Sequence, residues 1–276
     1  MQIQVVLYRS ERWAPRLVHA LDSLTSLIAG SGVAVWDNDP GSSPSIEQAC
    51  AVRKWHYVAT EAGNVGFGRG HNALAWQCPA TVEYLLLLNH DAVPFYDSYA
   101  QLLAVAEANP DAGLIEPAQF PNEHAKVFDP QTLETGWCAA VSLLVRRAAY
   151  QSLKGFDERF QIYCEDVDFS WRAWLAGWRC LYVPTARVLH VTGNFDLDKR
   201  RDQELRQLLL GGLFLRGKYF GNGEVRRWLG SLRRAYPPRL ADELEAQYAA
   251  ASVSLLKGAH HPRITLDTGF SPLRWQ

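Results

Sequence analysis

The stretch YLLLLNHDA (84–92) joins a wholly apolar run, residues 84–88, to the polar residues Asn89, His90 and Asp91. A short run that is apolar at every position is typical of a strand covered on both faces, as in the interior of a parallel sheet. The polar residues follow at its carboxyl end, which is the end where open α/β sheets bind ligands. This stretch therefore predicts a central strand that leads directly into a ligand site.

The sequence before this strand alternates short apolar runs with helical spacing. Three strands are predicted there, at residues 3–8, 33–36 and 55–59, and one helix at residues 14–28. Such alternation is typical of an α/β fold with a doubly wound, mostly parallel sheet. Polar clusters at 37–38, 64–72 and 89–91 come after predicted strands. We expect these clusters to meet at one edge of the sheet.

The second half of the chain follows a different pattern. Residues 121–135 are polar and irregular. The segments after them predict a strand at 139–145, a helix at 165–176, short strands at 181–183 and 187–190, and a helical region at 199–257. We therefore predict an α/β domain over 1–198 and a helical C-terminal extension over 199–276 that packs on it.

Composition narrows the class of protein. The net charge is −1 over 276 residues, so no overall field would attract nucleic acid. The five cysteines form no CxxC pair, which fits a reducing compartment rather than a disulfide framework. The amino-terminal residues lack the apolar core of a signal peptide, and the apolar run at 208–215 is too short to cross a bilayer. These features favour a cytoplasmic protein with no nucleic-acid partner.

Seven short motifs occur in one order along the chain: VVLYRSE (5–11), VWDN (35–38), NVGFGRGHN (64–72), LLLLNHDA (85–92), GFDERF (155–160), CEDVDFSWR (164–172) and LYVPTARVLH (181–190). Together they resemble the inverting glycosyltransferases of family 2, which have the GT-A fold, and within them the bacterial rhamnosyltransferase-like branch. The resemblance implies a metal-dependent hexosyltransferase. Such an enzyme takes a sugar from a dTDP- or UDP-sugar, here with dTDP-rhamnose favoured, and passes it to a saccharide or lipid-linked hydroxyl in cell-surface polysaccharide synthesis.

The resemblance also assigns the donor site. Asp37 matches the acid that accepts a hydrogen bond from the imino N–H of the nucleobase, although an acid at this place also suits a turn. The other donor contacts fall on amide and glycine residues, namely Asn38, Asn64, Gly66, Gly68, Asn72 and Asn89. Glycine lets backbone N–H groups approach a phosphate or ribose closely, because no Cβ intervenes.

Asn89-His90-Asp91 occupies the place of the family's Asp-x-Asp metal motif. The first acid is an amide in this chain, so one negative charge is missing and Asp91 would carry the contact with Mg²⁺ or Mn²⁺. His190 matches a histidine that contributes to the metal or diphosphate site in several GT-A enzymes. A lone histidine after an apolar run is also compatible with a purely structural role.

The acidic pair Glu165-Asp166 matches the residues from which the acceptor's general base is drawn. We predict that Asp166 is this base and that Glu165 orients it or substitutes for it. Acids in the first turn of a helix are also favoured by the helix dipole, so the pair has a structural interpretation as well. Crowded carboxylates raise one another's pKa, which suits a base. Trp137 is predicted to contact the acceptor, with core packing as its alternative.

Two other functions are compatible with parts of this pattern. A sugar-phosphate nucleotidyltransferase would use a similar sheet, but it needs a glycine-rich, basic loop after the first strand, where this chain has YRSE (8–11). A catalytically silent nucleotide- or glycan-binding module is favoured by Asn89 alone.

Residues 199–234 carry ten basic side chains against three acidic ones. Such a cluster predicts peripheral contact with the anionic inner face of the cell membrane, and its alternative is a solvated helical face.

Overall fold

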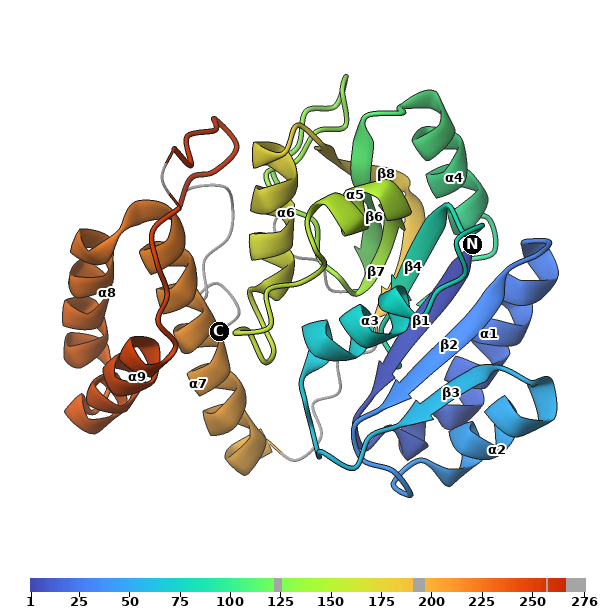
Figure 1. Ribbon diagram of the computed structural model, residues 1–276, viewed down its shortest axis with the longest axis horizontal. Coiled ribbons are helices and arrows are strands. Elements are labelled where there is room, and N and C mark those ends of the chain that lie inside the picture. The colour runs from blue at the N-terminus through green and yellow to red at the C-terminus, as the bar shows by residue number, and fades with distance from the viewer. Residues whose placement is uncertain (122–125, 191–196, 257, 267–276) are drawn as a thin grey trace.

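The computed structural model describes residues 1–121, 126–190, 197–256 and 258–266, but not the side chains of 197–201. Within these residues, eight strands form one mixed sheet in the order β3-β2-β1-β4-β7-β6-β8-β5 (Figure 1). The strands are β1 (Gln2–Leu7), β2 (Gly32–Asp37), β3 (His56–Ala59), β4 (Tyr84–Leu88), β5 (Ala92–Pro94), β6 (Ala112–Phe120), β7 (Ser142–Arg146) and β8 (Arg179–His190).

The first half of the sheet is parallel, as the sequence predicts. Strand β1 pairs in parallel with β2 and β4, so that Leu7 lies opposite Asp37 and Gln4 lies opposite Leu87. The carboxyl ends of these strands therefore lie along one edge. That edge carries the polar clusters 37–38 and 89–91, which confirms the expectation that they share one end of the sheet.

The second half of the sheet contains antiparallel pairs. Strand β7 is antiparallel to β4 on one side and to β6 on the other. Strand β8 is a single strand where the sequence predicts two, because its register with β6 shifts at residues 184–186 without ending the pairing. Strand β5, which the sequence does not predict, runs antiparallel to the end of β8. These short antiparallel pairings bring the end of β8 next to the residues after β4.

Helices cover both faces of the sheet, as expected for a doubly wound fold. The helices of the α/β part are α1 (Ala14–Leu27), α2 (Pro44–Arg53), α3 (Phe67–Trp76), α4 (Ser98–Ala108), α5 (Arg147–Ser152) and α6 (Glu165–Leu175), with the short helix η1 (Glu11–Trp13) before α1. One core forms between the sheet and α1, α2 and α4. A second core forms on the opposite face against α3, α5 and α6.

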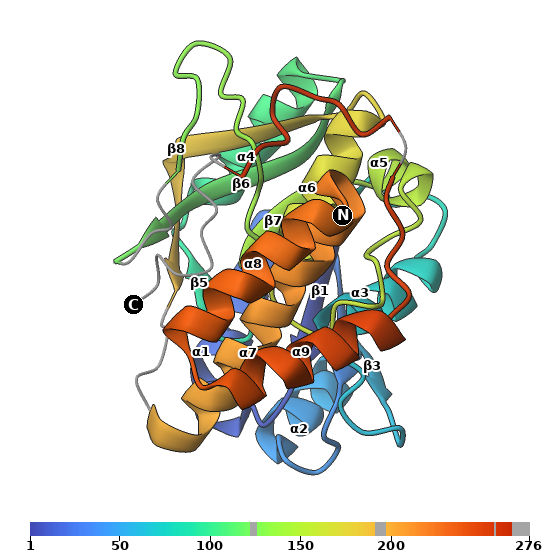
Figure 2. The same ribbon diagram turned by 90° about the vertical axis from the view of Figure 1, so that its left-hand side faces the viewer.

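The C-terminal helices build a third core on the far side of α6 (Figures 1 and 2). They are α7 (Leu197–Leu215), the π-helical segment η2 (Arg216–Phe220), α8 (Asn222–Ala235) and α9 (Pro238–Ala250). Their apolar side chains pack on Phe160, Val167 and Trp171 of the α/β part. No helix in the described part of the chain is long and apolar enough to span a bilayer.

Candidate active site

Asp91 and His190 face each other although they are far apart in the sequence. Asp91 follows β4, and the pairing of β5 with β8 places Ala92 opposite His190. His190 Nε2 lies 3.5 Å from Asp91 Oδ1, and both side chains are largely buried. Although burial opposes ionisation, the hydrogen bond from His190 and the nearby His90 hold the pKa of Asp91 below its ordinary value. The fold therefore brings together the two residues predicted to bind a metal.

The second ring nitrogen of His190 is held by Gln119 of β6. His190 Nδ1 lies 3.0 Å from Gln119 Oε1, and Gln119 Nε2 lies 3.5 Å from Glu116 Oε1. With Nδ1 turned to the amide oxygen of Gln119, Nε2 is the ring nitrogen that faces Asp91. Metal-binding histidines commonly donate their other N–H to such a partner. One carboxylate oxygen and one imidazole nitrogen therefore fit a divalent cation at this place.

The protein offers few ligands to such a cation. No group of three or more histidine, cysteine, aspartate or glutamate side chains is placed to hold a metal in the residues that the structure describes. The oxygens of a diphosphate and water would have to complete the coordination, as is usual for Mg²⁺. The site residues fit a cation that arrives with a phosphate-bearing ligand.

Asp166 lies in the first turn of α6, next to the segment that leads into β7. Ala140 N donates to Asp166 Oδ2 at 3.3 Å, and Asn89 N donates to Val141 O at 2.9 Å. Adjacent residues of one segment thus contact both the base candidate and the strand end that carries Asp91. The predicted catalytic and metal-binding residues belong to one edge of the sheet.

Burial changes the acidity of the predicted acidic pair. Burial raises the pKa of Asp166 above its ordinary value. Hydrogen bonds from Ala140 and Val167 and the positive charge of Lys126 lower this pKa, but burial has the larger effect. The pKa of Glu165 is raised well above its ordinary value by burial and then by Asp166. Glu165 Oε2 is buried and has no hydrogen-bond partner among the residues that the structure describes. A buried carboxyl of this kind is the form expected of an acid–base group.

The backbone before α6 is strained. Tyr163 and Cys164 have φ values of 69° and 67°, a left-handed conformation that costs a non-glycine residue about 1–3 kcal/mol. Gly211 of α7 packs against this turn, and a Cβ at Gly211 would lie 2.8 Å from Tyr163 O. The C-terminal extension therefore supports the turn that positions Glu165 and Asp166.

Asn38 and Asn64 shape the loop before α3. Asn38 Oδ1 accepts hydrogen bonds from Val65 N at 3.1 Å and from Trp36 Nε1 at 3.0 Å. Asn64 Oδ1 accepts one from Gly66 N at 2.9 Å. The first and second polar clusters of the predicted donor site, 37–38 and 64–72, are therefore in direct contact. Their contact with a donor stays a prediction.

The glycines of this loop are explained by contacts within the protein. Gly66 has φ +101°, and a Cβ there would lie 2.5 Å from Gln161 O. A Cβ at Gly68 would lie 2.8 Å from Phe156 Cβ. Both glycines thus allow the loop to pack against residues 156–161. This packing was not predicted from the sequence, which assigned the glycines to a phosphate or ribose.

Asn72 and Asp37 are satisfied inside the protein. Asn72 is 3% exposed, and its side chain bonds Tyr150 Oη and both backbone groups of Phe156. Asp37 is fully buried and accepts hydrogen bonds from Tyr57 Oη at 2.8 Å and Asp39 N at 2.9 Å. Each side chain holds local structure, and their predicted donor contacts stay predictions.

Trp137 belongs to the core between α6 and the C-terminal helices and is 3% exposed. Lys126 Nζ lies 3.5 Å from the centroid of its ring and donates to Trp137 O at 2.9 Å. Lys126 also contacts Glu116 Oε2 at 2.7 Å, and both charged side chains are nearly inaccessible. The geometry agrees with the core-packing alternative for Trp137, whose contact with an acceptor stays a prediction. Sequence reasoning missed Glu116 and Lys126, because nothing local marks either residue.

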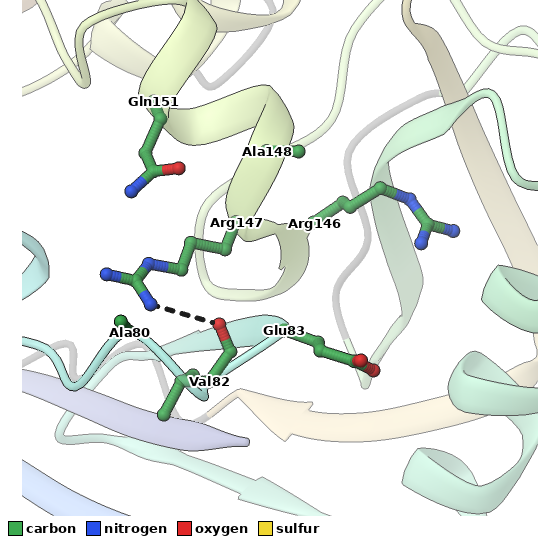
Figure 3. Close-up of a pocket in the computed structure, with 7 residues that line it drawn as sticks. All are labelled: Ala80, Val82, Glu83, Arg146, Arg147, Ala148 and Gln151. Atoms are coloured by element: carbon green, nitrogen blue, oxygen red, sulfur yellow. Dashed lines mark hydrogen bonds between the residues drawn. The ribbon is translucent and has the colours of Figure 1, made fainter.

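A surface hollow lies away from these residues (Figure 3). It is lined by residues at the amino end of β4 and the end of β7, namely Ala80, Val82, Glu83, Arg146, Arg147, Ala148 and Gln151. Arg147 donates to the carbonyl of Val82 across it. The hollow lies at the opposite end of β4 from Asp91 and is no part of the predicted site.

Known glycosyltransferases resemble this chain in sequence and in fold. A family model described as "Glycosyl transferase family group 2" matches residues 134–253. N-acetylglucosaminyl-diphospho-decaprenol L-rhamnosyltransferase of Mycobacterium tuberculosis is 48% identical, over 64% of this chain and 72% of the relative. This chain belongs to glycosyltransferase family 2. Within the family it is rhamnosyltransferase-like, as the seven motifs predict.

Two further comparisons agree with this membership. Rhamnosyltransferase WbbL of Escherichia coli is 43% identical over 55% of this chain and 70% of the relative. The mannosyltransferase PcManGT of Pyrobaculum calidifontis, solved with GDP-Man and Mn²⁺, is similar in structure with a TM-score of 0.58 at 14% identity, over 91% of this chain and 79% of that one. The structural likeness confirms the GT-A fold. This family 2 member is a glycosyltransferase that uses a nucleotide-sugar, and the family decides against the nucleotidyltransferase alternative.

Proposed function

We propose that this glycosyltransferase moves a rhamnosyl unit from dTDP-rhamnose to a hydroxyl of a lipid-linked saccharide, with inversion at the anomeric carbon. The donor sugar is supported by the relatives from M. tuberculosis and E. coli, which are both rhamnosyltransferases. The lipid-linked acceptor is supported by the relative from M. tuberculosis, whose name contains a sugar-diphospho-decaprenol. The observation that carries the site assignment is the meeting of Asp91 and His190 beside the segment that contacts Asp166.

In this proposal Asp166 accepts the proton of the acceptor hydroxyl as that oxygen attacks the anomeric carbon of the donor. Ala140 N and Val167 N orient its carboxylate through the hydrogen bonds described above. Glu165, whose raised pKa favours the protonated form, leaves a single negative charge on the pair. Asp166 then differs from Glu165 because backbone donors stabilise its ionised form.

Asp91 and His190 would hold Mg²⁺ or Mn²⁺ together with the donor diphosphate. When bound, the cation supplies Lewis-acid stabilisation of the negative charge on the leaving nucleoside diphosphate. Gln119 fixes the ring of His190 so that Nε2 faces this place. Asn89 replaces the first acid of the family motif, and we expect metal affinity below that of a site with two acids.

The base assignment is tested by Asp166→Asn. This change keeps the size of the side chain and removes the proton acceptor, so the transfer rate should fall about 10²–10⁴-fold, the usual contribution of a general base. The measurement is rhamnosyl transfer from dTDP-rhamnose to a lipid-linked or short synthetic acceptor. Near wild-type turnover in this variant would show that another group is the base. Hydrolysis of the donor without acceptor separates the enzyme from a catalytically silent module.

The metal assignment is tested by Asp91→Ala, with Asp111→Ala as the control. Asp111 is an exposed acid that pairs with Arg179 at the opposite end of β6 from Gln119. Stabilisation of the fold by dTDP plus Mn²⁺ should disappear in Asp91→Ala and persist in Asp111→Ala, because only Asp91 supplies a metal ligand. Equal stabilisation of both variants would remove Asp91 from the metal site.

A cytoplasmic location with peripheral contact of residues 199–234 with the inner membrane face also belongs to this proposal. Several basic side chains counted in that prediction are engaged within the protein. Arg216 and Lys218 are buried, and Arg206, Arg227 and Arg233 pair with acids. Lys199, Arg200 and Arg201 lie outside the described side chains. The remaining exposed pair, Arg226 and Arg234, gives limited support. Co-sedimentation with anionic vesicles at low salt tests the contact, and its absence would remove it.

A further inference from the structure

We propose that Lys126 is a positioning residue for the general base: it clamps the segment that donates to Asp166 and supplies the positive charge that keeps this carboxylate ionised. The inference deepens the proposed function and rests on Asp166 being the base. It concerns a lysine that the sequence pattern does not mark and that lies within the polar region 121–135 after β6.

The ammonium of Lys126 is held on three sides. It contacts Glu116 Oε2 at 2.7 Å, donates to Trp137 O at 2.9 Å, and lies 3.5 Å from the centroid of the Trp137 ring. Its side chain is 3% exposed and that of Glu116 is 1% exposed. Removing two charges from water is costly, and pairs of this kind are not needed for stability, since apolar residues of similar volume often serve as well. The pair therefore calls for a functional explanation.

The held segment connects Lys126 to the base. Lys126 fixes the carbonyl of Trp137, and the next residue, Cys138, donates its N–H to Ser170 Oγ at 3.0 Å. Two residues further on, Ala140 N donates to Asp166 Oδ2 at 3.3 Å. Ser170 Oγ also donates to Asp166 O at 2.7 Å. Residues 137–140 are thus held by a hydrogen bond from Lys126 at one end and by a hydrogen bond to Ser170 of helix α6 in the middle. At the other end, Ala140 N donates a hydrogen bond to the base.

The charges around Asp166 are otherwise unfavourable to its ionised form. In the described part of the chain, the titratable groups that interact with Asp166 are Glu165, Cys164, Glu116 and Lys126. In the same turn, Arg216 and Asp168 face Cys164, and Glu204 and Asp91 face Tyr163. Burial raises the pKa of Asp166, and Lys126 lowers it. Glu116 holds Lys126 in place, and burial raises the pKa of Glu116 itself to about 7 in spite of Lys126. Near neutral pH the positive charge of Lys126 is therefore only partly cancelled by its partner.

The test is the pH profile of transfer in Lys126→Gln and Lys126→Arg. Glutamine keeps an N–H donor but carries no charge, so the acid limb of kcat/KM should move up by about 1 pH unit, at the lower end of the effect of an opposite charge. One pH unit below the wild-type limb this is about a tenfold loss, which should vanish at high pH. Lys126→Arg keeps the charge and should keep the limb close to its wild-type position.

The control is Arg146→Met. Arg146 also holds backbone carbonyls, those of Ala106 and Ala112, but at the end of β7 that lies away from Asp166. Its loss should leave the acid limb in place. If Lys126→Gln does not fold, the double variant Lys126→Gln/Glu116→Gln replaces the buried ion pair by a neutral hydrogen-bonded pair, and the limb should again move up.

The proposal would be overturned if the acid limb of kcat/KM stayed in place in the neutral variants while activity fell equally at every pH. Lys126 would then be a structural residue. A limb that moves equally in Lys126→Gln and Lys126→Arg would also overturn it, because the charge would then not be responsible. Both outcomes are distinct from failure of the base assignment, which would appear as near wild-type turnover in Asp166→Asn.

Discussion

Replacing Lys218 by methionine should destabilise the protein strongly, because this side chain joins the C-terminal extension to the α/β part through buried charges. Lys218 Nζ lies 2.7 Å from Asp157 Oδ2 and 2.6 Å from Asp168 Oδ1, and the Lys218 and Asp168 side chains are 5% and 0% exposed. Removing one partner from a buried pair costs about 3–5 kcal/mol. Asp168 keeps Arg172 at 2.7 Å and Tyr219 Oη at 2.8 Å. We therefore expect the loss in free energy of unfolding to lie at the lower end of this range, about 3 kcal/mol.

The assay is urea unfolding, with the melting temperature as a second reading. A loss of about 3 kcal/mol corresponds to a fall of roughly 6–12 °C for a protein of this size. The control is Arg233→Met, whose ion pairs with Asp242 and Glu245 are exposed and should be worth about 0–1 kcal/mol. If Lys218→Met and Arg233→Met lose the same small free energy of unfolding, the buried cluster does not hold the extension in place.

Three further outcomes are expected. First, although burial opposes it, Arg159 and Lys218 hold the pKa of Asp157 below its ordinary value. The stability that Asp157 contributes is therefore present above about pH 4 and is lost as the pH falls. Urea titrations between about pH 2 and 7 should show that the free energy of unfolding depends less on pH in Lys218→Met than in the wild type. Second, because burial raises the pKa of Asp166, wild-type kcat/KM should fall on the acid side with a limb above about pH 4, and a flat profile down to that pH would contradict the buried base. Third, Gly66→Ala should raise the KM for the donor and lower stability by more than Gly63→Ala does. Both glycines have positive φ, but of these two positions only Gly66 has a described neighbour within 4 Å of an added Cβ. Equal effects of the two substitutions would show that the contact with Gln161 is not the cause.

Strands and their order of appearance were largely predictable from the sequence. The apolar run at 84–88 indicates a central strand by itself, and β4 occupies these residues. Prediction failed where the local signal was weak. Strand β5 has three residues and depends on β8 for its pairing, so it exists only after distant parts of the chain meet. Strand β6 carries a buried glutamate and a proline among its apolar residues, which breaks the simple pattern.

The candidate site was predictable in its residue types and less so in their surroundings. Asp91 and His190 were named from motifs, and their meeting required the antiparallel pairing of β5 with β8. Asp37 was expected to present its carboxylate to a nucleobase, and that contact stays a prediction. The sequence did not indicate that Tyr57 and the backbone of Asp39 each donate to one of its oxygens. Burial and hydrogen-bond partners depend on residues far away in the chain. No local pattern can report them.

By itself, the sequence determined the family, the α/β class and the polar positions that follow the strands, because apolar periodicity and short motifs are local properties of the chain. Only the tertiary structure decided which of those polar groups face one another and which are enclosed. Lys126 shows the reason most clearly. It lies within the polar, irregular segment 121–135, yet it is enclosed between Glu116 and Trp137. A charge acquires its effect on a neighbouring carboxylate from distance and exclusion of water, and both are set only when the chain has folded.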